Sequence, residues 1–248
     1  RVTISWLRLA RELSDEAPVE WAVFSCEVWM IIGWDIISGT EDWRKSMIWN
    51  NAILFIHAPK TAGMSMTTLL CQSLEGPINV TGPYEQQHSE GKVTYIPGKR
   101  HETLIDAASF LTYRNMCLEQ FEKIFVVMRN PYELELSRYA YLKKNLPQDR
   151  GMAQNIALEG DFRNYLSKAP FFGMNPPRLD LYYHFNGSMP DNLVILRHER
   201  LLLDLELHLA LYLEAGYALP RENQSKHKGV NEMYDADYFK KGILERLI

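Results

Sequence analysis

Residues 53–65 of this chain read ILFIHAPKTAGMS, and this segment shapes the expected architecture more than any other. Ile53 to Ile56 form a short, continuous apolar run of the kind that becomes a buried strand. A loop of small and polar residues follows, and Met66 to Leu70 then have the composition of a helix. A strand, a loop and a helix in immediate succession predict the first unit of an α/β fold.

The rest of the sequence continues this alternation of apolar runs and helical patterns. Further buried strands are expected at residues 93–96, 124–128 and 193–196. Helices are expected at residues 103–121, 131–144, 199–213 and 235–248. Because strands that alternate with helices pair in parallel through crossover connections, the sequence predicts an α/β fold with three layers. Its plan would be like that of a P-loop kinase, with a central parallel sheet flanked by helices.

The loop PKTAGMS, residues 59–65, has the features of an anion site. A helix that begins inside a small-residue loop points several backbone N–H groups at one spot, and its dipole adds a partial positive charge there. Lys60 can reach the bound group, and Thr61 and Ser65 can donate their hydroxyls. The segment is not a Walker A loop, because Lys60 precedes Gly63 instead of following the second glycine. An ordinary strand–helix turn is the alternative.

A second motif, RNPYELELS, occupies residues 129–137. Arg129 follows the expected strand IFVVM, and Pro131 is well placed to open the next helix. Ligands of open α/β sheets bind beyond the carboxyl ends of the strands, where Arg129 would lie. Arg129 and Ser137 can therefore share a second phosphate, with the guanidinium offering two N–H groups. The alternative is an arginine that caps the sheet edge and a serine packed in a helix.

Together these motifs resemble the sulfotransferases that use 3′-phosphoadenosine 5′-phosphosulfate (PAPS). The segment FIHAPKTAGMS looks like that family's loop for the 5′-phosphosulfate, and RNPYELELS looks like its 3′-phosphate signature, usually closer to RNPYDRLVS. The similarity spans roughly residues 51–248 and is nearest to the branch of carbohydrate O-sulfotransferases and their bacterial relatives. The segments NLVILRHERL (192–201) and NEMYDADY (231–238) are weaker matches to the same family.

The resemblance implies a role for each matching residue. Lys60 would contact the sulfuryl group and its bridging oxygen. Arg129 and Ser137 would hold the 3′-phosphate. The 5′-phosphate would be cradled, mostly by backbone groups, by Lys60, Thr61, Ala62, Gly63, Met64, Ser65 and Met66. Leu134 stands where the family commonly has Arg, and Glu135 stands where it has an apolar residue, which leaves the helix packing and the acceptor side open.

The base for sulfuryl transfer is expected at the segment GKRHET, residues 98–103. Transfer to an alcohol needs a group that takes the hydroxyl proton, and an imidazole suits this at neutral pH. His101 directly precedes an expected helix, and many relatives carry a similar "KHaT" element there. His101 is the expected base and Glu102 is its rival. A solvated basic turn is the structural alternative, and the other histidines, including His57 before the loop, are expected to be structural.

Composition narrows the classes of partner. The chain has 248 residues and a formal net charge of −4, so no overall basic field exists to hold nucleic acid. The three cysteines, Cys26, Cys71 and Cys117, are far apart and form no C-x-x-C pair, which argues against a zinc ribbon or a disulfide framework. No histidine pair has metal-ligand spacing, and the chemistry of the family needs no metal.

The first 50 residues form a separate segment of unknown role. It holds all six tryptophans of the chain. The domain that resembles the sulfotransferases is expected at residues 51–248. Residues 21–38 are strongly apolar but contain Glu27 and Asp35, and acidic groups in a membrane span are costly. We therefore favour a helix packed on the domain or lying at an interface over a membrane anchor. A cytoplasmic location is preferred, and the Golgi lumen with an N-terminal anchor is the alternative.

The chain starts at Arg1 and stops within a helix-like run, so we expect a domain truncated at its C-terminus. The expected function is transfer of the sulfuryl group of PAPS to an acceptor hydroxyl, carried by a sugar, a glycan or a lipid, with a carbohydrate favoured. Two alternative functions stay open. One is a nucleotide-dependent kinase or phosphotransferase with an unusual P-loop, and the other is a non-catalytic adaptor that binds nucleotide.

Overall fold

The structure is a computed structural model, and it describes residues 47–99, 101–144, 151–169 and 179–220. All of these residues belong to the second of two units into which the chain divides, Asp42–Ile248. The apolar segment 21–38 and the helix expected at 235–248 lie outside the described residues. The boundary expected at residue 50 would leave Met47–Trp49 outside the domain, whereas the structure places these residues in the sheet and divides the chain after Glu41.

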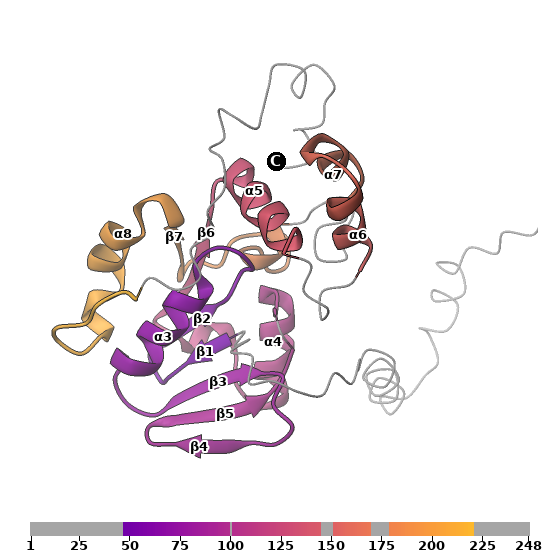
Figure 1. The fold of residues 1–248 in the computed structure, drawn as a ribbon. Coiled ribbons are helices and arrows are strands. Elements are labelled where there is room, and N and C mark those ends of the chain that lie inside the picture. Colours follow the sequence, from indigo (N-terminus) through magenta and orange to yellow (C-terminus); the bar gives the residue numbers. More distant parts are fainter. Residues whose placement is uncertain (1–46, 100, 145–150, 170–178, 221–248) are drawn as a thin grey trace, which may run out of the picture. The chain divides into compact units, whose positions relative to one another are not determined.

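The described residues form one seven-stranded sheet with the order β4-β5-β3-β1-β2-β6-β7 (Figure 1). Its strands are β1 (Met47–Trp49), β2 (Ile53–Ile56), β3 (Ile78–Gly82), β4 (His88–Glu90), β5 (Val93–Pro97), β6 (Lys123–Met128) and β7 (Leu193–Arg197). The strands predicted at 53–56, 93–96, 124–128 and 193–196 are thereby confirmed. β2 and most of β6 are buried, whereas β5 and β7 are buried only in part.

The sheet is mixed, so the expectation of a parallel sheet is only partly right. β2, β6 and β7 are parallel neighbours, and so are β3 and β5. β1 lies between β2 and β3 and is antiparallel to both, and β4 is antiparallel to β5 at the edge. Because β1 is antiparallel to both of its neighbours, β2 and β3 run in the same direction. The carboxyl ends of β2, β3, β5, β6 and β7 therefore meet at one edge of the sheet.

Helices cover both faces of this sheet. On one face, α3 (Gly63–Ser73) and α8 (Leu201–His208) pack against side chains such as Phe55 and Phe125. On the other, α4 (Leu104–Tyr113) and the 3₁₀-helix Leu118–Gln120 pack against Leu54 and Val126. Neighbouring residues of one strand thus face opposite layers, as the alternation of a pleated strand requires. The α/β class predicted from the sequence is confirmed.

A third apolar cluster lies among helices α5 (Pro131–Leu142), α6 (Met152–Glu159) and α7 (Phe162–Lys168). Tyr165 is fully buried at its centre, and its ring is 5.1 Å from that of Tyr139 on α5. Figure 1 shows these three helices grouped together beyond the carboxyl end of β6. The cluster packs α5 against α6 and α7.

Two expected helices are shorter than their apolar spacing indicated. The helix predicted at 103–121 ends at Tyr113, because Asn115 adopts a left-handed conformation with φ 59° and Met116 N–H donates to the carbonyl of Leu111. Those bonds form the Schellman motif that closes many helices. The helix predicted at 199–213 ends at His208, and a 3₁₀-helix at Ala210–Tyr212 follows it before Leu213 pairs in extended conformation with Leu74.

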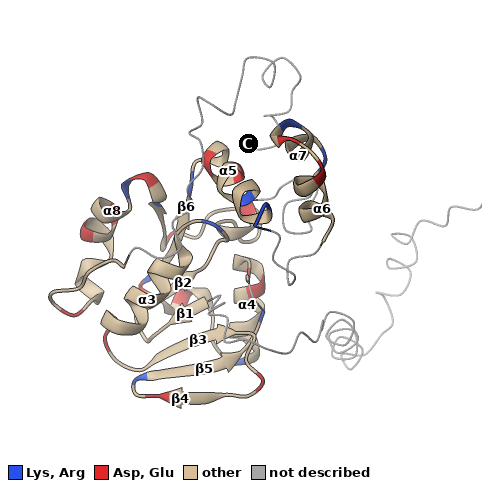
Figure 2. Cartoon of the chain, viewed as in Figure 1, with Lys and Arg blue, Asp and Glu red and all other residues tan. Residues whose placement is uncertain are grey.

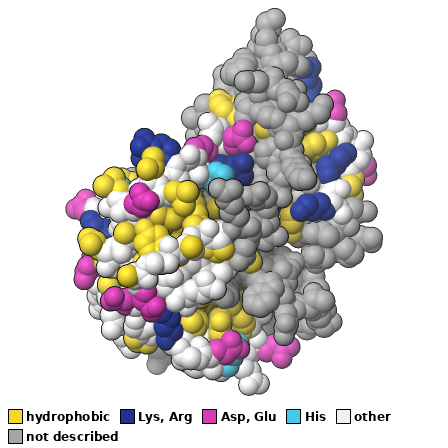
Figure 3. All heavy atoms as spheres, turned by 60° about the vertical axis from the view of Figure 1, so that its left-hand side comes forward, with side chains coloured by type: hydrophobic (Ala, Val, Ile, Leu, Met, Phe, Trp, Pro, Cys, Tyr) yellow, Lys and Arg dark blue, Asp and Glu magenta, His cyan; other side chains and the backbone are white. Residues whose placement is uncertain are grey.

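Several apolar side chains in and just after α8 lie on the surface. The exposed leucines of this region are Leu202, Leu203, Leu207 and Leu211. Figure 3, which brings the α8 side of the molecule forward, shows hydrophobic side chains gathered on this face. Among the helices of the described ranges, none combines the length and apolar composition needed to span a bilayer.

Candidate functional site

Three segments singled out in the sequence lie at the edge where the parallel strands end. The loop 57–62 follows β2, residues 129–130 follow β6, and residues 98–103 follow β5. β2 and β6 pair directly, with Ile56 opposite Val126. The loop and Arg129 therefore leave neighbouring strands in the same direction, at nearly the same level.

The loop between β2 and α3 turns through two left-handed residues. Lys60 has φ 64° and Ala62 has φ 66°, which side chains other than glycine rarely adopt. The buried hydroxyl of Thr61 donates to the carbonyl of Ala58 at 2.8 Å and links the two ends of this turn. Ala62 is the N-cap of α3 and offers no side-chain acceptor to the first amide groups of the helix. The turn therefore starts α3 without the polar cap that Ser, Thr, Asp or Asn would supply.

The residues of this loop are not equivalent. Lys60 and Met64 are partly exposed, and Ser65 is buried. Met66 is fully buried in the core, and its N–H donates to the carbonyl of Ala62 at 3.0 Å. Gly63, Met64, Ser65 and Met66 of the predicted phosphate loop thus belong to α3, and the side chain of Met66 lies in the hydrophobic core.

Gly63 is required by a close packing contact. A Cβ atom at this position would lie 1.7 Å from Nε2 of His57. The φ of Gly63 is not in the left-handed region, so the glycine serves the close approach of the imidazole and no special backbone conformation. His57, expected to be structural, is buried against the first residue of α3.

Lys60 and α5 are in direct contact. Nζ of Lys60 lies 4.2 Å from the centroid of the Tyr141 ring, within the range of a cation–π interaction. Tyr141 is near the end of α5, the helix that begins with the RNP motif. The contact joins the loop to the C-terminal part of the helix that begins in the second motif, and Tyr141 is a residue that the sequence analysis missed.

Arg129 is largely buried and only partly neutralised. Its Nη2 lies 3.3 Å from Oε2 of Glu133, one turn along α5, and its side chain is 13% exposed. Within the described part of the chain, no group accepts a hydrogen bond from its buried Nε. Burial lowers the pKa of the guanidinium, against the opposing charges of Glu133 and Glu199. A buried cation with an unused N–H donor is suited to an anionic ligand.

The start of α5 is fixed by two polar contacts. The side chain of Asn130 accepts from the N–H groups of Tyr132 and Glu133, and Pro131 occupies the first turn as predicted. The backbone N–H of Asn130 donates to Oε1 of Glu199 at 2.8 Å. Ser137 is buried on the second turn of this helix. Glu199 is a second residue that the sequence analysis missed; it lies at the start of the helix predicted at 199–213.

His101 lies beside the loop that follows β2. Its ring packs edge-on against that of His57, with centroids 5.2 Å apart and an interplanar angle of 86°. His57 in turn contacts Gly63, so the ring of His57 lies between His101, the predicted base, and the start of α3. His101 therefore lies close to the loop between β2 and α3.

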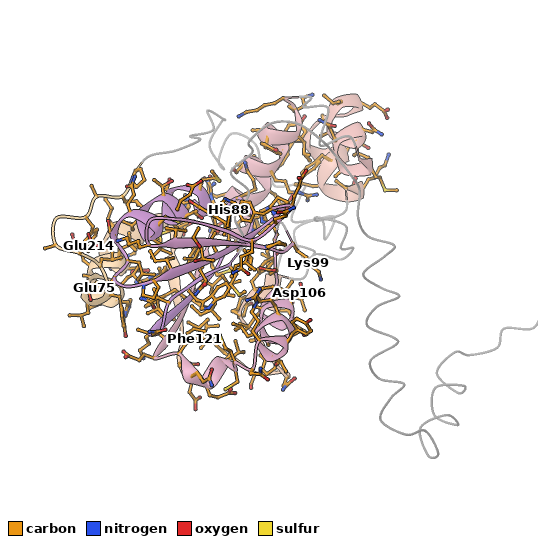
Figure 4. All side chains as sticks on the ribbon, turned by 90° about the horizontal axis from the view of Figure 1, so that it is seen from below. Glu75, His88, Lys99, Asp106, Phe121 and Glu214 are labelled. Atoms are coloured by element: carbon orange, nitrogen blue, oxygen red, sulfur yellow. The ribbon has the colours of Figure 1, made fainter. Side chains whose placement is uncertain are left out.

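Glu102, the rival base, has a different environment. It is 2% exposed, and its Oε2 accepts the hydroxyl of Thr81 at 2.7 Å. The same hydroxyl oxygen accepts the N–H of Met47, so Glu102 supports the junction of β3 and β1. The next residue, Thr103, is the N-cap of α4 in a complete capping box with Asp106. Figure 4 shows Lys99 beside Asp106, and their charged groups are 2.7 Å apart.

The two departures from the family pattern are both in the helix interior. Leu134 is buried. Glu135 is 4% exposed, and its Oε2 accepts from Nη1 of Arg138 at 3.3 Å and from the hydroxyl of Tyr165 at 2.6 Å. Figure 2 shows acidic and basic positions close together on α5. Glu135 therefore joins α5 to α7, and its role is in helix packing.

No group of three or more His, Cys, Asp or Glu side chains arranged to hold a metal ion is found among the residues that the structure describes. Comparison of the chain with protein-family models, with curated protein sequences and with solved structures found no match. The case for a function therefore rests on the residues of this site.

Proposed function

We propose that this protein is a sulfotransferase that moves the sulfuryl group of PAPS to an acceptor hydroxyl. The observation that carries the proposal is the contact between Lys60 and Tyr141, because it joins the loop PKTAGMS to the helix of the RNP motif. Two cationic side chains, Lys60 and Arg129, then serve one end of the sheet. A donor with a 5′-phosphosulfate and a 3′-phosphate needs two such anion sites.

The residues of the site fit such a donor. The first amide groups of α3 have no side-chain acceptor from the N-cap, and the dipole of this eleven-residue helix favours an anion there. These groups, with Lys60, would hold the 5′-phosphosulfate. The unused Nε of Arg129 is suited to the 3′-phosphate, with the buried hydroxyl of Ser137 further along the same helix. In this proposal the plan of the domain is that of a P-loop kinase.

The chemistry would be an in-line transfer. The oxygen of the acceptor forms a bond to sulfur while the bond between sulfur and the bridging oxygen of the phosphate breaks. His101 takes the proton of the acceptor hydroxyl, and Lys60 stabilises the negative charge that develops on the leaving phosphate. The products are a sulfate ester and 3′-phosphoadenosine 5′-phosphate (PAP). Positioning and electrostatics supply the catalysis, as they do in phosphoryl transfer.

Glu102 is the weaker candidate for the base. Its carboxylate is occupied by Thr81 and sits under the strand junction, whereas His101 lies beside the anion loop. We propose an acceptor of low charge, a sugar, a glycan or a lipid, because the net charge of −4 disfavours a densely sulfated polymer.

The test is a transfer assay with PAPS and a panel of sugar, glycan and lipid alcohols, with PAP as the measured product. We expect transfer to at least one class of acceptor. His101→Ala should lower the rate about 10²- to 10⁴-fold, the usual contribution of a general base, while PAP still binds. His88→Ala, at an exposed position on β4, is the matched control and should leave the rate unchanged. Failure of the wild-type protein to bind PAP would overturn the proposal.

A further inference from the structure

His198 occupies a position equivalent to that of Arg129 on the adjacent strand. β6 and β7 are parallel, with Met128 opposite Arg197, so the next residues, Arg129 and His198, leave the sheet side by side. The two strand ends are also tied together, because the N–H of Asn130 donates to Glu199, the residue after His198. This geometry places a half-buried imidazole next to the buried guanidinium that has an unused donor.

Three charged groups act on His198. Arg129 follows β6, Glu133 lies on α5, and Glu199 is the next residue in the chain. Burial is the first cause that lowers the pKa of His198 below its usual value, and the charge of Arg129 lowers the pKa further. Glu199 and Glu133 act in the opposite direction without reversing the shift. An unperturbed histidine has a pKa of about 6.5, so His198 is neutral at neutral pH in the protein without ligand.

We propose that His198 is a second ligand for the anion that Arg129 binds, and that it takes up a proton from the solvent when that anion arrives. This inference rests on the proposed function, and it concerns the 3′-phosphate of PAPS or PAP. A phosphate monoester carries close to two negative charges at neutral pH, which offset the charge of Arg129 and favour the imidazolium. The protonated ring then adds one charge-assisted N–H donor to those of Arg129.

Proton uptake on binding fixes the direction in which the affinity for PAP changes with pH. Because the complex holds one more proton than the free protein, affinity for PAP rises as the pH falls toward the usual pKa of histidine. Full uptake of one proton changes the dissociation constant about tenfold per pH unit. The effect should fade below a pH of about 6, where the phosphate itself becomes protonated.

Calorimetric titration of the full chain with PAP, in two buffers of different ionisation enthalpy, measures this uptake directly. Adenosine 5′-monophosphate, which lacks the 3′-phosphate, is the matched ligand. We expect proton uptake with PAP and none with the monophosphate, and a PAP dissociation constant that weakens at least about threefold per unit above neutral pH. In His198→Gln the extra uptake should be lost, whereas His88→Gln, at the exposed start of β4, should behave as wild type.

The results that would overturn the inference are distinguishable. Equal proton uptake in wild type and His198→Gln would remove His198 from the site while leaving the proposed function intact. Absence of PAP binding to the wild-type chain would overturn both proposals. Where His198→Gln does not fold, wild-type protein alone still tests the inference, because equal proton uptake with PAP and with the monophosphate would contradict it.

Discussion

The ammonium group of Lys60 lies 4.2 Å from the centre of the Tyr141 ring, and this contact connects two segments that are far apart in the sequence. Lys60 belongs to the loop after β2, and Tyr141 lies near the end of α5. The lysine is thereby directed toward the helix whose first turn follows Arg129. The Tyr141 ring is therefore a partner of the Lys60 ammonium group at the edge of the sheet where the proposed donor would bind.

Replacing Tyr141 with Leu should weaken PAP binding. A cation–π contact is worth about 0.5–2 kcal/mol, so loss of the ring should raise the dissociation constant roughly two- to thirtyfold. Tyr141→Phe retains the ring face and should bind PAP as wild type does. Tyr113→Leu, an exposed tyrosine on α4, is the control. Tighter binding by Tyr141→Leu would show instead that the ring holds Lys60 away from the ligand.

Gly63→Ala should destabilise the protein through His57. The new Cβ would lie 1.7 Å from Nε2 of the imidazole, so the ring must move. Overpacking of this kind costs about 1–3 kcal/mol, measurable by chemical denaturation. In the double variant with His57→Ala the cost of the alanine at position 63 should largely disappear, since contacting residues are not additive. Additive effects would mean that the two residues are independent.

Glu135→Ala should destabilise the packing of α5 on α7. The side chains of Glu135 and Arg138 are 5% and 4% exposed, and Glu135→Ala removes a carboxylate from beside the buried guanidinium. Such a loss costs about 3–5 kcal/mol, whereas replacement of both partners by leucine is often much milder. Glu119→Ala, on the surface, is the control. Unfolding in urea distinguishes these variants, and a double leucine variant less stable than Glu135→Ala would contradict this account.

Asp204 should make stability depend on acid pH. Its carboxylate accepts two hydrogen bonds from the guanidinium of Arg197 and one from the backbone N–H of Arg197. These bonds, led by those of the side chain, lower the pKa of Asp204 from 3.8 to about 2. A lowered pKa contributes stability that is present above the unfolded value and lost as the pH falls through the folded value.

At neutral pH the free energy of unfolding should therefore be larger for wild type than for Asp204→Asn. That difference should shrink as the pH falls from 3.8 toward 2. Asp191→Asn, at an exposed position, supplies the control curve. A difference that stays constant across this range would show that the charge of Asp204 is not what stabilises the fold.

The buried strands were the most predictable part of the fold. Segments such as Ile124–Met128 are apolar on both faces because helices cover the sheet on both sides, and that burial is visible in composition alone. β4 (His88–Glu90) could not be found in this way, since it is exposed and polar. β1 has only three residues, and its antiparallel pairing on both sides depends on long-range contacts that a local pattern does not contain.

The site was predictable where a motif fixes a residue to a strand end. Lys60, Arg129 and His101 follow β2, β6 and β5, so their common edge follows from the direction of those strands. The contact of Tyr141 with Lys60 and the position of His198 beside Arg129 were missed, because they depend on which helix and which strand are neighbours. Asn115 did carry a local signal, since asparagine tolerates the left-handed conformation that ends α4.

The most direct test of the central claim is thermal stabilisation of the full chain by PAP, measured beside ATP with magnesium. A ligand at about 100 times its dissociation constant adds roughly 2.7 kcal/mol to the stability of the folded state. We predict a clear upward shift with PAP that is lost in Arg129→Ala. A shift with ATP and magnesium but none with PAP would contradict the account and indicate a phosphotransferase.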